Sequence, residues 1–552
     1  MGRAGGKLAL VLRALVIDFG NRDLGRLGIA RVGVSFAAWS FAIALGVYGF
    51  EIGGAVAVGV IALVRLMPGA IASPFAGLLG DRFPRRTVLV GSGLAITAVL
   101  AGAAAATAVE TAPVVVFALA GLFTVAISGY VPAEAALLPV LARTPQELSA
   151  SNVTHSAMEN SGFLIAALTT GVLLAVATPA VVFGVAALVA LLATLVLAGI
   201  KRDQRPDYVT DGEISGVLRQ TALGFRTLVE HPGLRLAAAT LIVLVFFEGT
   251  AEVLVVILAL DMLELGHGSV GYLNAAWGIG ALVGGAGLAI LLDRGRLAAG
   301  LAGGSVVVAL ATALPGAWPV AVAAYAGWIG IGVGYTIVEV AAKTLLQRLG
   351  SDETLGRVIG SLEAARMAAM AIGSISASAI VALLGTRGAL IALAAVLPLF
   401  VILFWTRLRA FEVGAPVAEG NYTLLRENSI FTPLPVATLE RISHDLIPVA
   451  VQTGEEVITQ GDQGDRFFLI EEGEVEVFED GDFCRAEGPG ESFGEIALLR
   501  DVPRTATVRT KVPTRLLALE RDQFIAAVTG HQRSHQVAHT VVDARWTSPE
   551  LS

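Results

Sequence analysis

A short charged loop separates two long apolar segments near the N-terminus: Gly77-Leu78-Leu79-Gly80-Asp81-Arg82-Phe83-Pro84-Arg85-Arg86. A shorter version, Leu291-Leu292-Asp293-Arg294-Gly295-Arg296, follows an apolar segment in the second half of the chain. Each version places an aspartate directly before an arginine at the end of an apolar stretch. Because the two loops hold equivalent places in two runs of apolar segments, they indicate an internal duplication of the chain.

The composition is typical of a membrane protein. Of the 552 residues, 55% are hydrophobic and only 15% are charged, and the mean hydropathy is +0.75. An ordinary soluble protein is excluded by this balance. The 63 glycines suit helices that pack closely in a bilayer. The net charge of −8, without a long basic stripe, argues against nucleic-acid binding, and the single cysteine, Cys484, fits a reducing compartment.

Apolar stretches long enough for an α-helix to cross the hydrocarbon, about 20 residues each, run from Gly28 to the region of Trp405. We predict about twelve spans, near 28–49, 54–79, 87–108, 113–138, 153–175, 178–200, 235–259, 270–292, 297–316, 319–342, 357–384 and 387–406. The expected units are an N-terminal cytoplasmic or interfacial segment (1–27), a six-helix half (28–200), a connector (201–234) and a second six-helix half (235–406).

The lysines and arginines fall in alternate loops on one side of the predicted spans. They are Arg82, Arg85, Arg86, Arg143, Lys201, Arg202, Arg205, Arg294, Arg296, Lys343, Arg348 and Arg357. By the positive-inside rule that side is cytoplasmic. We therefore expect a multi-pass protein of the inner or plasma membrane with both termini, and everything after the last span, in the cytoplasm.

The loop at Gly77 to Arg86 resembles the Gly-x-x-x-Asp-Arg-x-x-Arg-Arg loop of the major facilitator superfamily, and the resemblance extends over about residues 28–406. It implies a secondary transporter, and the compact loops are most similar to the drug- and siderophore-exporter branches. Asp81 can lie beside the positive end of a helix of the opposite half, near Gly356. The implied latch on the cytoplasmic side consists of Asp81, Arg82, Arg85, Arg86, Asp293 and Arg294. Alternatively, the arginines only fix topology.

Ionisable residues inside the spans are candidates for substrate binding or proton coupling, because a charge in hydrocarbon is costly unless it faces a cavity or a partner. Glu248 and Glu252 are four apart and share a helix face, so they form a candidate proton-loading pair or line a hydrated vestibule. Arg65, and Glu159 with Asn160, are placed to pair across a cavity of the N-terminal half; alternatively, Arg65 is a structural arginine that caps carbonyls freed at the Met67-Pro68 kink or contacts a neighbouring helix. Near the cytoplasmic ends we expect gating salt bridges from Glu134, Glu339 with Lys343, and Glu363 with Arg366.

Beyond a mixed linker over 407–427, the residues 428–546 read as a separate soluble domain. Short alternating segments such as Phe467 to Ile470 and Glu474 to Phe478 are separated by glycines, which is the pattern of short strands joined by turns. A small β-roll with flanking helices is predicted.

One segment of this domain has the groups that a cyclic phosphodiester needs. It is Phe493-Gly494-Glu495-Ile496-Ala497-Leu498-Leu499, followed by Pro503-Arg504-Thr505-Ala506-Thr507-Val508. Backbone N–H groups and an arginine bind phosphate, and a carboxylate accepts from a ribose hydroxyl. Together with the glycine turns of Gly461 to Val475, the segment resembles the phosphate-binding cassette of cyclic nucleotide-binding domains.

That resemblance implies a role for each residue of the cassette. Glu495 accepts from the ribose 2′-hydroxyl, Arg504 pairs with the cyclic phosphate, and Gly494 permits close backbone approach. The amides of Ile496, Ala497 and Thr505 add donors. We favour cAMP as the ligand, with cGMP as the alternative because of the Thr505 hydroxyl. A helix over 521–546 is the expected lid.

Taken together, these residues predict a transporter of a small amphiphilic or drug-like molecule that an ion gradient drives and a cyclic nucleotide regulates. The rivals are an exporter of the cyclic nucleotide itself, a membrane-anchored receptor that does not transport, and a domain that binds nucleotide only for stability. No catalytic constellation is present and the seven histidines lack metal-ligand spacing, so neither an enzyme nor a metal site is expected. The oligomeric state is not specified by these residues.

Overall fold

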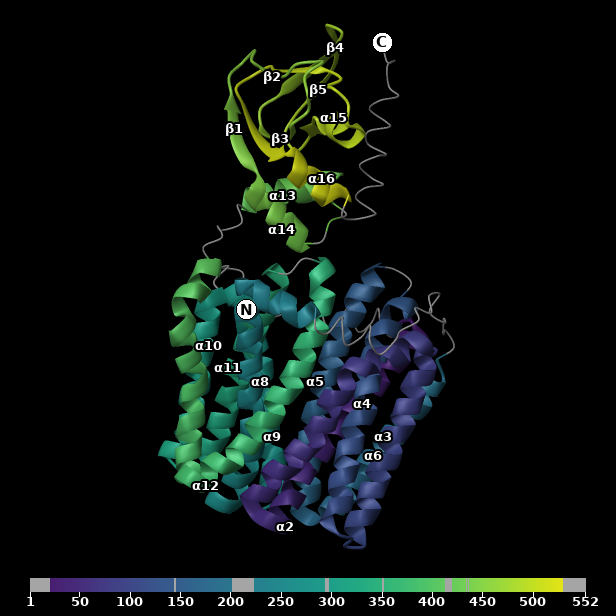
Figure 1. Ribbon diagram of the computed structural model, residues 1–552, viewed down its shortest axis with the longest axis vertical. Coiled ribbons are helices and arrows are strands. Elements are labelled where there is room, and N and C mark those ends of the chain that lie inside the picture. The colour runs from purple at the N-terminus through teal and green to yellow at the C-terminus, as the bar shows by residue number, and fades with distance from the viewer. Residues whose placement is uncertain are drawn as a thin grey trace. The chain divides into compact units, whose positions relative to one another are not determined.

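In the computed structural model the described residues are 20–142, 145–200, 223–292, 297–349, 352–412, 419–432, 434 and 436–529. They belong to two compact units, Met1–Arg409 and Ala410–Ser552 (Figure 1). The first unit is helical, and the second combines two small sheets with short helices. The predicted connector over 201–234 falls partly outside the described residues, as does the predicted lid helix beyond Thr529.

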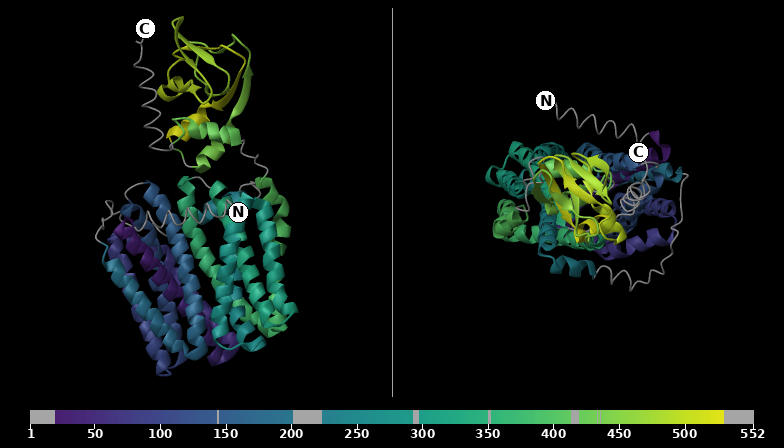
Figure 2. Two further views of the ribbon diagram at one scale, coloured as in Figure 1. Left: turned by 180° about the vertical axis from the view of Figure 1, so that it is seen from behind. Right: turned by 90° about the horizontal axis from the view of Figure 1, so that it is seen from above.

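The first unit is a bundle of long helices that lie side by side in Figures 1 and 2. Its elements are α2 (Arg22–Arg82), α3 (Arg85–Ala108), α4 (Pro113–Leu141), α5 (Pro145–Val176), α6 (Pro179–Ala198), α8 (Pro232–Ile257), the π-helical turn η1 (Leu258–Met262), α9 (Gly268–Leu292), α10 (Leu297–Ala317), α11 (Ala321–Leu349) and α12 (Asp352–Glu412). Among the described residues, nine helices are long and apolar enough to cross a membrane. The predicted multispan α-helical fold is confirmed.

Two of these helices each contain two of the predicted spans. In α2 the helical backbone breaks at Gly53 and Gly54, where Gly54 has a φ of 59°, and in α12 it breaks at Gly385, with a φ of 69°. Both positive angles lie in the left-handed region, which glycine adopts without a Cβ clash. The two breaks lie at the same end of the bundle, since Ser378 Oγ donates to the Ala55 carbonyl at 2.6 Å. We call this the Gly53 end, and the opposite end, where α2 begins, the Arg22 end.

Glycines let the two halves of the bundle touch at the Gly53 end. A Cβ on Gly271 of α9 would lie 2.4 Å from the Cα of Gly171 in α5, and one on Gly59 of α2 would lie 2.1 Å from Ser378 Oγ in α12. A Cβ on Gly271 would therefore meet backbone atoms and move a helix, whereas one on Gly59 would displace the Ser378 side chain. Small residues bring helices into close contact here, as expected for packing in a bilayer.

The second unit contains two four-stranded antiparallel sheets, ordered β1-β8-β3-β6 and β2-β7-β4-β5. The strands are β1 (Ile447–Val451), β2 (Glu456–Ile458), β3 (Arg466–Glu472), β4 (Val475–Glu479), β5 (Asp482–Glu487), β6 (Ser492–Phe493), β7 (Thr507–Thr510) and β8 (Thr514–Glu520). The helices are α13 (Glu419–Glu427), α14 (Val436–Asp445), α15 (Glu495–Arg500) and α16 (Arg521–Thr529). The predicted β-roll with flanking helices is confirmed.

Strand β3 divides the apolar core of this unit into two clusters, because alternate side chains of a strand point to opposite faces. Phe467 faces the helices, where its ring stacks on Phe524 of α16 at 4.7 Å between centroids. Phe468 faces the space between the sheets and stacks on Phe493 at 5.3 Å. Since Phe493 is the first residue of the cassette, the core fixes the point at which the cassette leaves β6.

Candidate functional site

The cassette turns sharply between β6 and α15. Gly494 stands at this turn with a φ of 89°, in the left-handed region. A Cβ on Gly494 would lie 2.7 Å from Arg504 Nη1 and 3.1 Å from the Arg466 carbonyl oxygen. Glycine is therefore required both by the backbone conformation and by the approach of the Arg504 guanidinium.

Arg504 is held inside this turn by backbone carbonyls. Its side chain donates to Gly494 O at 3.0 Å and to Arg466 O at 2.7 Å, and its Nη2 lies 3.3 Å from Asp465 Oδ1. The residue is only 5% exposed. Burial lowers the pKa of Arg504 from its ordinary value, although the carboxylates of Asp465 and Glu495 oppose this effect. A buried guanidinium whose negative partners do not offset its desolvation favours an additional anion.

Glu495 lies in the same pocket. It is the first residue of α15, it is 1% exposed, and its charge acts on Arg504. Ile496 and Ala497 follow in the first turn of α15, where backbone N–H groups have no acceptor within the helix. Two backbone hydrogen bonds, Gly461 N to Arg504 O at 2.8 Å and Arg504 N to Asp462 O at 2.7 Å, join the Arg504–Thr505 loop to the Gly461 turn. The structure thus brings the predicted residues together.

The helical unit contains a cavity of about 550 Å³ that both halves line. Of the residues that the sequence singled out, Glu159, Asn160, Glu248 and Glu252 all line it. Arg65 lines a small adjoining pocket instead, together with Glu252. The predicted candidates therefore gather at one place between the halves rather than in the N-terminal half alone.

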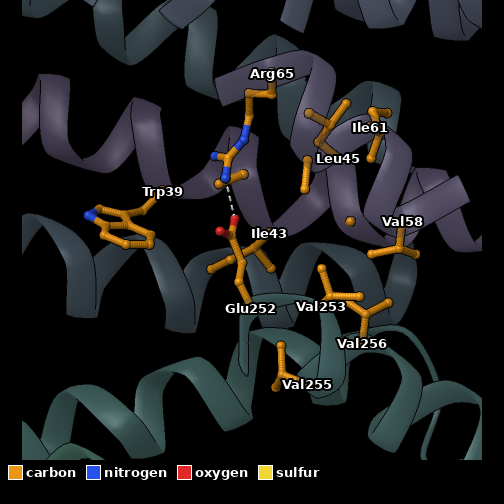
Figure 3. Close-up of a pocket in the computed structure, with 13 residues that line it drawn as sticks. Trp39, Ile43, Leu45, Val58, Ile61, Arg65, Glu252, Val253, Val255 and Val256 are labelled. Atoms are coloured by element: carbon orange, nitrogen blue, oxygen red, sulfur yellow. Dashed lines mark hydrogen bonds and ion pairs between the residues drawn. The ribbon is translucent and has the colours of Figure 1, made fainter. Parts of the chain in front are cut away.

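The ion pairs across this cavity differ from the predicted ones. Arg65 of α2 pairs with Glu252 of α8, with 2.5 Å between Nη2 and Oε1, and Figure 3 shows the two side chains pointing at each other. The prediction that Arg65 pairs with Glu159 was wrong. Glu159 pairs instead with Arg31, at 2.7 Å. Arg31 lies near the start of α2 and Arg65 lies beyond the Gly53–Gly54 break, so the two arginines belong to different spans and reach different carboxylates.

Glu248 and Glu252 share a helix face as predicted, but their carboxylates have different partners. The Tyr335 hydroxyl of α11 donates to Glu248 Oε2 at 2.5 Å, whereas Glu252 is bound to Arg65. Four residues advance a helix by about 6 Å, so each carboxylate reaches a different neighbour.

Sequence reasoning missed Arg31, His155 and Tyr335. Arg31 Nη1 lies 2.8 Å from Glu134 Oε2, and His155 Nδ1 lies 3.3 Å from Glu134 Oε1. A signal for this cluster was present in the sequence, because Gly-Tyr-x-x-x-Glu occurs at Gly129 to Glu134 in α4 and again at Gly334 to Glu339 in α11. The repeat marks corresponding polar positions in the two halves.

The expected gating residues are only partly within the described structure. The side chains of Asp81 and Arg82 lie outside it, as do Asp293 and Arg294 entirely. Arg85 begins α3, and Arg86 Nη2 donates to the Ala198 carbonyl at the end of α6 at 2.5 Å, within the same half. Glu339 with Lys343 (2.7 Å) and Glu363 with Arg366 (3.3 Å) form ion pairs within single helices.

We expect the substitution Arg31→Met to destabilise the helical unit. It leaves the carboxylates of Glu134 and Glu159 without their shared cation, and removing one partner of a buried pair costs about 3–5 kcal/mol. The apparent Tm of the purified full-length protein in detergent should fall by several degrees. The control is Arg226→Met, whose pair with Glu230 is exposed on both sides and should leave the Tm unchanged. Equal Tm values for the two variants would contradict this assignment.

Two family models match the chain: Major Facilitator Superfamily over residues 27–361 and Cyclic nucleotide-binding domain over residues 448–531. A cAMP-dependent protein kinase regulatory subunit of Yarrowia lipolytica is 37% identical over 113 residues, which are 20% of this chain and 30% of that protein. The chain thus spans less than a third of that relative.

Solved structures also match part of the chain. The regulatory domain of Toxoplasma gondii PKA, crystallised with cAMP, is 30% identical over 20% of this chain and 43% of that one, with a TM-score of 0.19. A PKAR CBD2 structure with bound Sp-2Cl-cAMPS is 23% identical over 24% of this chain and 90% of that one, with a TM-score of 0.22. Because the first family model covers more than half of the sequence, the chain belongs to the major facilitator superfamily, and it carries a C-terminal cyclic nucleotide-binding domain.

Proposed function

We propose that the chain is a secondary transporter whose activity is set by a cyclic nucleotide bound between Gly494, Glu495 and Arg504. The observation that carries this proposal is the buried Arg504 guanidinium, held by two carbonyls beside the buried Glu495 carboxylate. Such a pair without a ligand costs free energy. A cyclic phosphate adds an anion beside Arg504, and the ribose hydroxyl of the nucleotide donates to Glu495.

The remaining cassette residues complete the pocket. The amides of Ile496, Ala497 and Thr505 donate to the phosphate, and Gly494 keeps the backbone clear of a Cβ. We favour cAMP as the ligand over cGMP, because the Yarrowia lipolytica relative, 37% identical over the matching 113 residues, is described as cAMP-dependent. The Thr505 hydroxyl keeps cGMP as the competitor in any binding assay.

Regulation requires only that the nucleotide binds two conformations of the chain with different affinity. The segment from Arg407 to Arg426 connects the last predicted span to the nucleotide-binding domain. Through this segment a conformational change of the domain reaches the transport unit. If the nucleotide shifts the equilibrium between two conformations of the transport unit by a given factor, its affinity for those two conformations must differ by the same factor. We place the domain in the cytoplasm, following the distribution of basic loop residues.

The transport unit works on a small molecule by alternating exposure of the cavity between its halves. Support comes from the volume of about 550 Å³, which lies in the range of small-molecule sites, and from the Arg65–Glu252 pair, which joins the halves through α2 and α8. We propose export driven by an ion gradient, with protons exchanging at Glu248 or Glu252. A latch of Asp81, Arg82, Arg85 and Arg86, with Asp293 and Arg294, controls the Arg22 end.

A distance measurement tests the regulation without knowledge of the substrate. Spin labels at Val176, the end of α5, and Leu383, beside the break in α12, report on the separation of the halves at the Gly53 end. The native Cys484 is first replaced by serine. In the full-length protein in nanodiscs, saturating cAMP should change the distance distribution. The same addition to Arg504→Ala should change nothing; a response of both proteins, or of neither, would overturn the proposal.

A further inference from the structure

Carboxylates outnumber basic side chains around the cavity. Among the described residues that line it, the carboxylates are Glu159, Glu248, Glu252, Glu339 and Glu363, and the basic residues are Arg31, Lys343 and Arg366. Arg65, bound to Glu252, and Glu134, bound to Arg31, extend this set. The described cluster thus has six carboxylates against four arginine or lysine side chains and one histidine, His155 beside Glu134, so its formal charge is negative.

Most of these carboxylates already have a cation within the protein. Four ion pairs occupy the basic groups, namely Arg31–Glu159 (2.7 Å), Arg65–Glu252 (2.5 Å), Lys343–Glu339 (2.7 Å) and Arg366–Glu363 (3.3 Å). Glu248 is different, because its described hydrogen-bond partner is the neutral Tyr335 hydroxyl. Arg366 also acts on Glu248 through space, but its guanidinium is bound to Glu363. Glu248 is therefore the carboxylate of this cavity that is available to an incoming cation.

Aromatic rings line the same cavity as this carboxylate, and one of them, Tyr335, contacts it. In the C-terminal half of the transport unit, the ring centroids of Trp277 and Tyr335 lie 5.3 Å apart at the cavity. In the N-terminal half, those of Trp39 and Phe163 lie 4.7 Å apart. The face of an aromatic ring attracts a cation, and its area binds an apolar body. A carboxylate in a cavity that tryptophan, tyrosine and phenylalanine rings line has the groups that an organic ammonium or phosphonium ion needs.

We propose that the cavity takes an organic cation, with its positive centre against Glu248 and its apolar body between the tryptophan and phenylalanine rings. This assignment rests on the proposed transport function and names its substrate class. A bare metal ion fits less well, since the described residues hold no group of three or more metal-ligating side chains. An anion, including a cyclic nucleotide, would be repelled by the net negative charge of the residues around the cavity. The nucleotide is then a signal and not the cargo.

Tetraphenylphosphonium is the probe that tests this inference, because its charge does not depend on pH. Tetraphenylborate has the same shape and the opposite charge, so it controls for partition into lipid. We expect the full-length protein in nanodiscs to bind radiolabelled tetraphenylphosphonium saturably and to show no saturable binding of tetraphenylborate. Glu248→Gln should weaken tetraphenylphosphonium binding at least tenfold. The amide oxygen of glutamine still accepts from the Tyr335 hydroxyl, so the substitution mainly removes charge.

Two further variants complete the test. Glu264→Gln removes the same charge from the loop before α9, outside the residues that line the cavity, and should bind like the native protein. Trp277→Leu should weaken binding without changing the charge. Saturable binding of both probe ions, or equal affinities of the Glu248→Gln and Glu264→Gln proteins, would overturn the inference.

The outcomes of this test separate the inference from the proposed function. If the protein shows no preference for the cation but the spin labels still respond to cAMP, the proposed substrate class is wrong and the proposed regulation stands. Glu248-dependent cation binding without any response to cAMP supports the substrate class and removes the regulation.

Discussion

Replacing Arg504 by alanine should remove high-affinity nucleotide binding from the full-length protein. Arg504 is 5% exposed and its guanidinium lies against the Gly494 turn, where a cyclic phosphate would bind it out of contact with water. Truncating one partner of a buried, hydrogen-bonded charge pair costs about 2–5 kcal/mol, so the Kd for cAMP should rise by roughly 30- to 4,000-fold. Isothermal titration calorimetry measures this change directly.

A second arginine of the same domain provides the matched control. Arg509 of β7 is exposed and pairs with Glu456 at 2.6 Å, so Arg509→Ala should leave the Kd unchanged. Because Arg504 also holds two backbone carbonyls, its loss also loosens the turn. Glu495→Gln separates the two effects, since it keeps the shape of the side chain and should still weaken binding about tenfold or more. Native affinity in Glu495→Gln would place the ribose elsewhere.

Adding one methyl group to Gly271 should force the halves of the transport unit apart at the Gly53 end. The new Cβ would lie 2.4 Å from Gly171 Cα and 2.7 Å from the Ala167 carbonyl oxygen, and backbone atoms cannot rotate away. Overpacking of this kind costs about 1–3 kcal/mol, which changes the ratio of two conformations by roughly 5- to 150-fold. The distance between spin labels at Val176 and Leu383 should lengthen in Gly271→Ala.

The control for this substitution is another helical glycine of the same unit. A Cβ on Gly303 of α10 would meet no described atom within 4 Å, so Gly303→Ala should leave the label distances as they are in the native protein. If Gly271→Ala also keeps the native distances, the α5–α9 contact does not hold this end closed.

The nucleotide site was predictable because its groups are close together in the sequence. Gly494 and Glu495 are adjacent, and Arg504 follows nine positions later on the loop that leads to β7. A turn glycine, a carboxylate and an arginine within one short segment can meet with few long-range contacts to arrange them. The sequence did not reveal the carbonyl groups of Gly494 and Arg466 that hold the guanidinium, because β3 brings Arg466 to the site from 38 positions away.

The polar network of the transport unit was predictable in membership but not in pairing. Hydropathy identified Arg65, Glu159, Glu248 and Glu252 as charges within apolar segments, and a charge in that environment needs a partner or a cavity. The partners proved to be far away in sequence: Glu252 is 187 positions from Arg65, and Tyr335 is 87 from Glu248. Hydropathy did not identify Arg31 as a charge within a span, because it lies close to the polar start of its apolar stretch.

Hydropathy and local motifs were enough to predict a multispan helical protein with a β-roll at its C-terminal side, and to identify the cassette. The reason is that apolar spans and a contiguous binding segment are properties of short stretches. The tertiary structure decided which charges pair across the halves, with Arg65 joined to Glu252 and Arg31 to Glu159. These pairings depend on how each helix is rotated and shifted against its neighbours, and contacts such as Gly171 with Gly271 set that register.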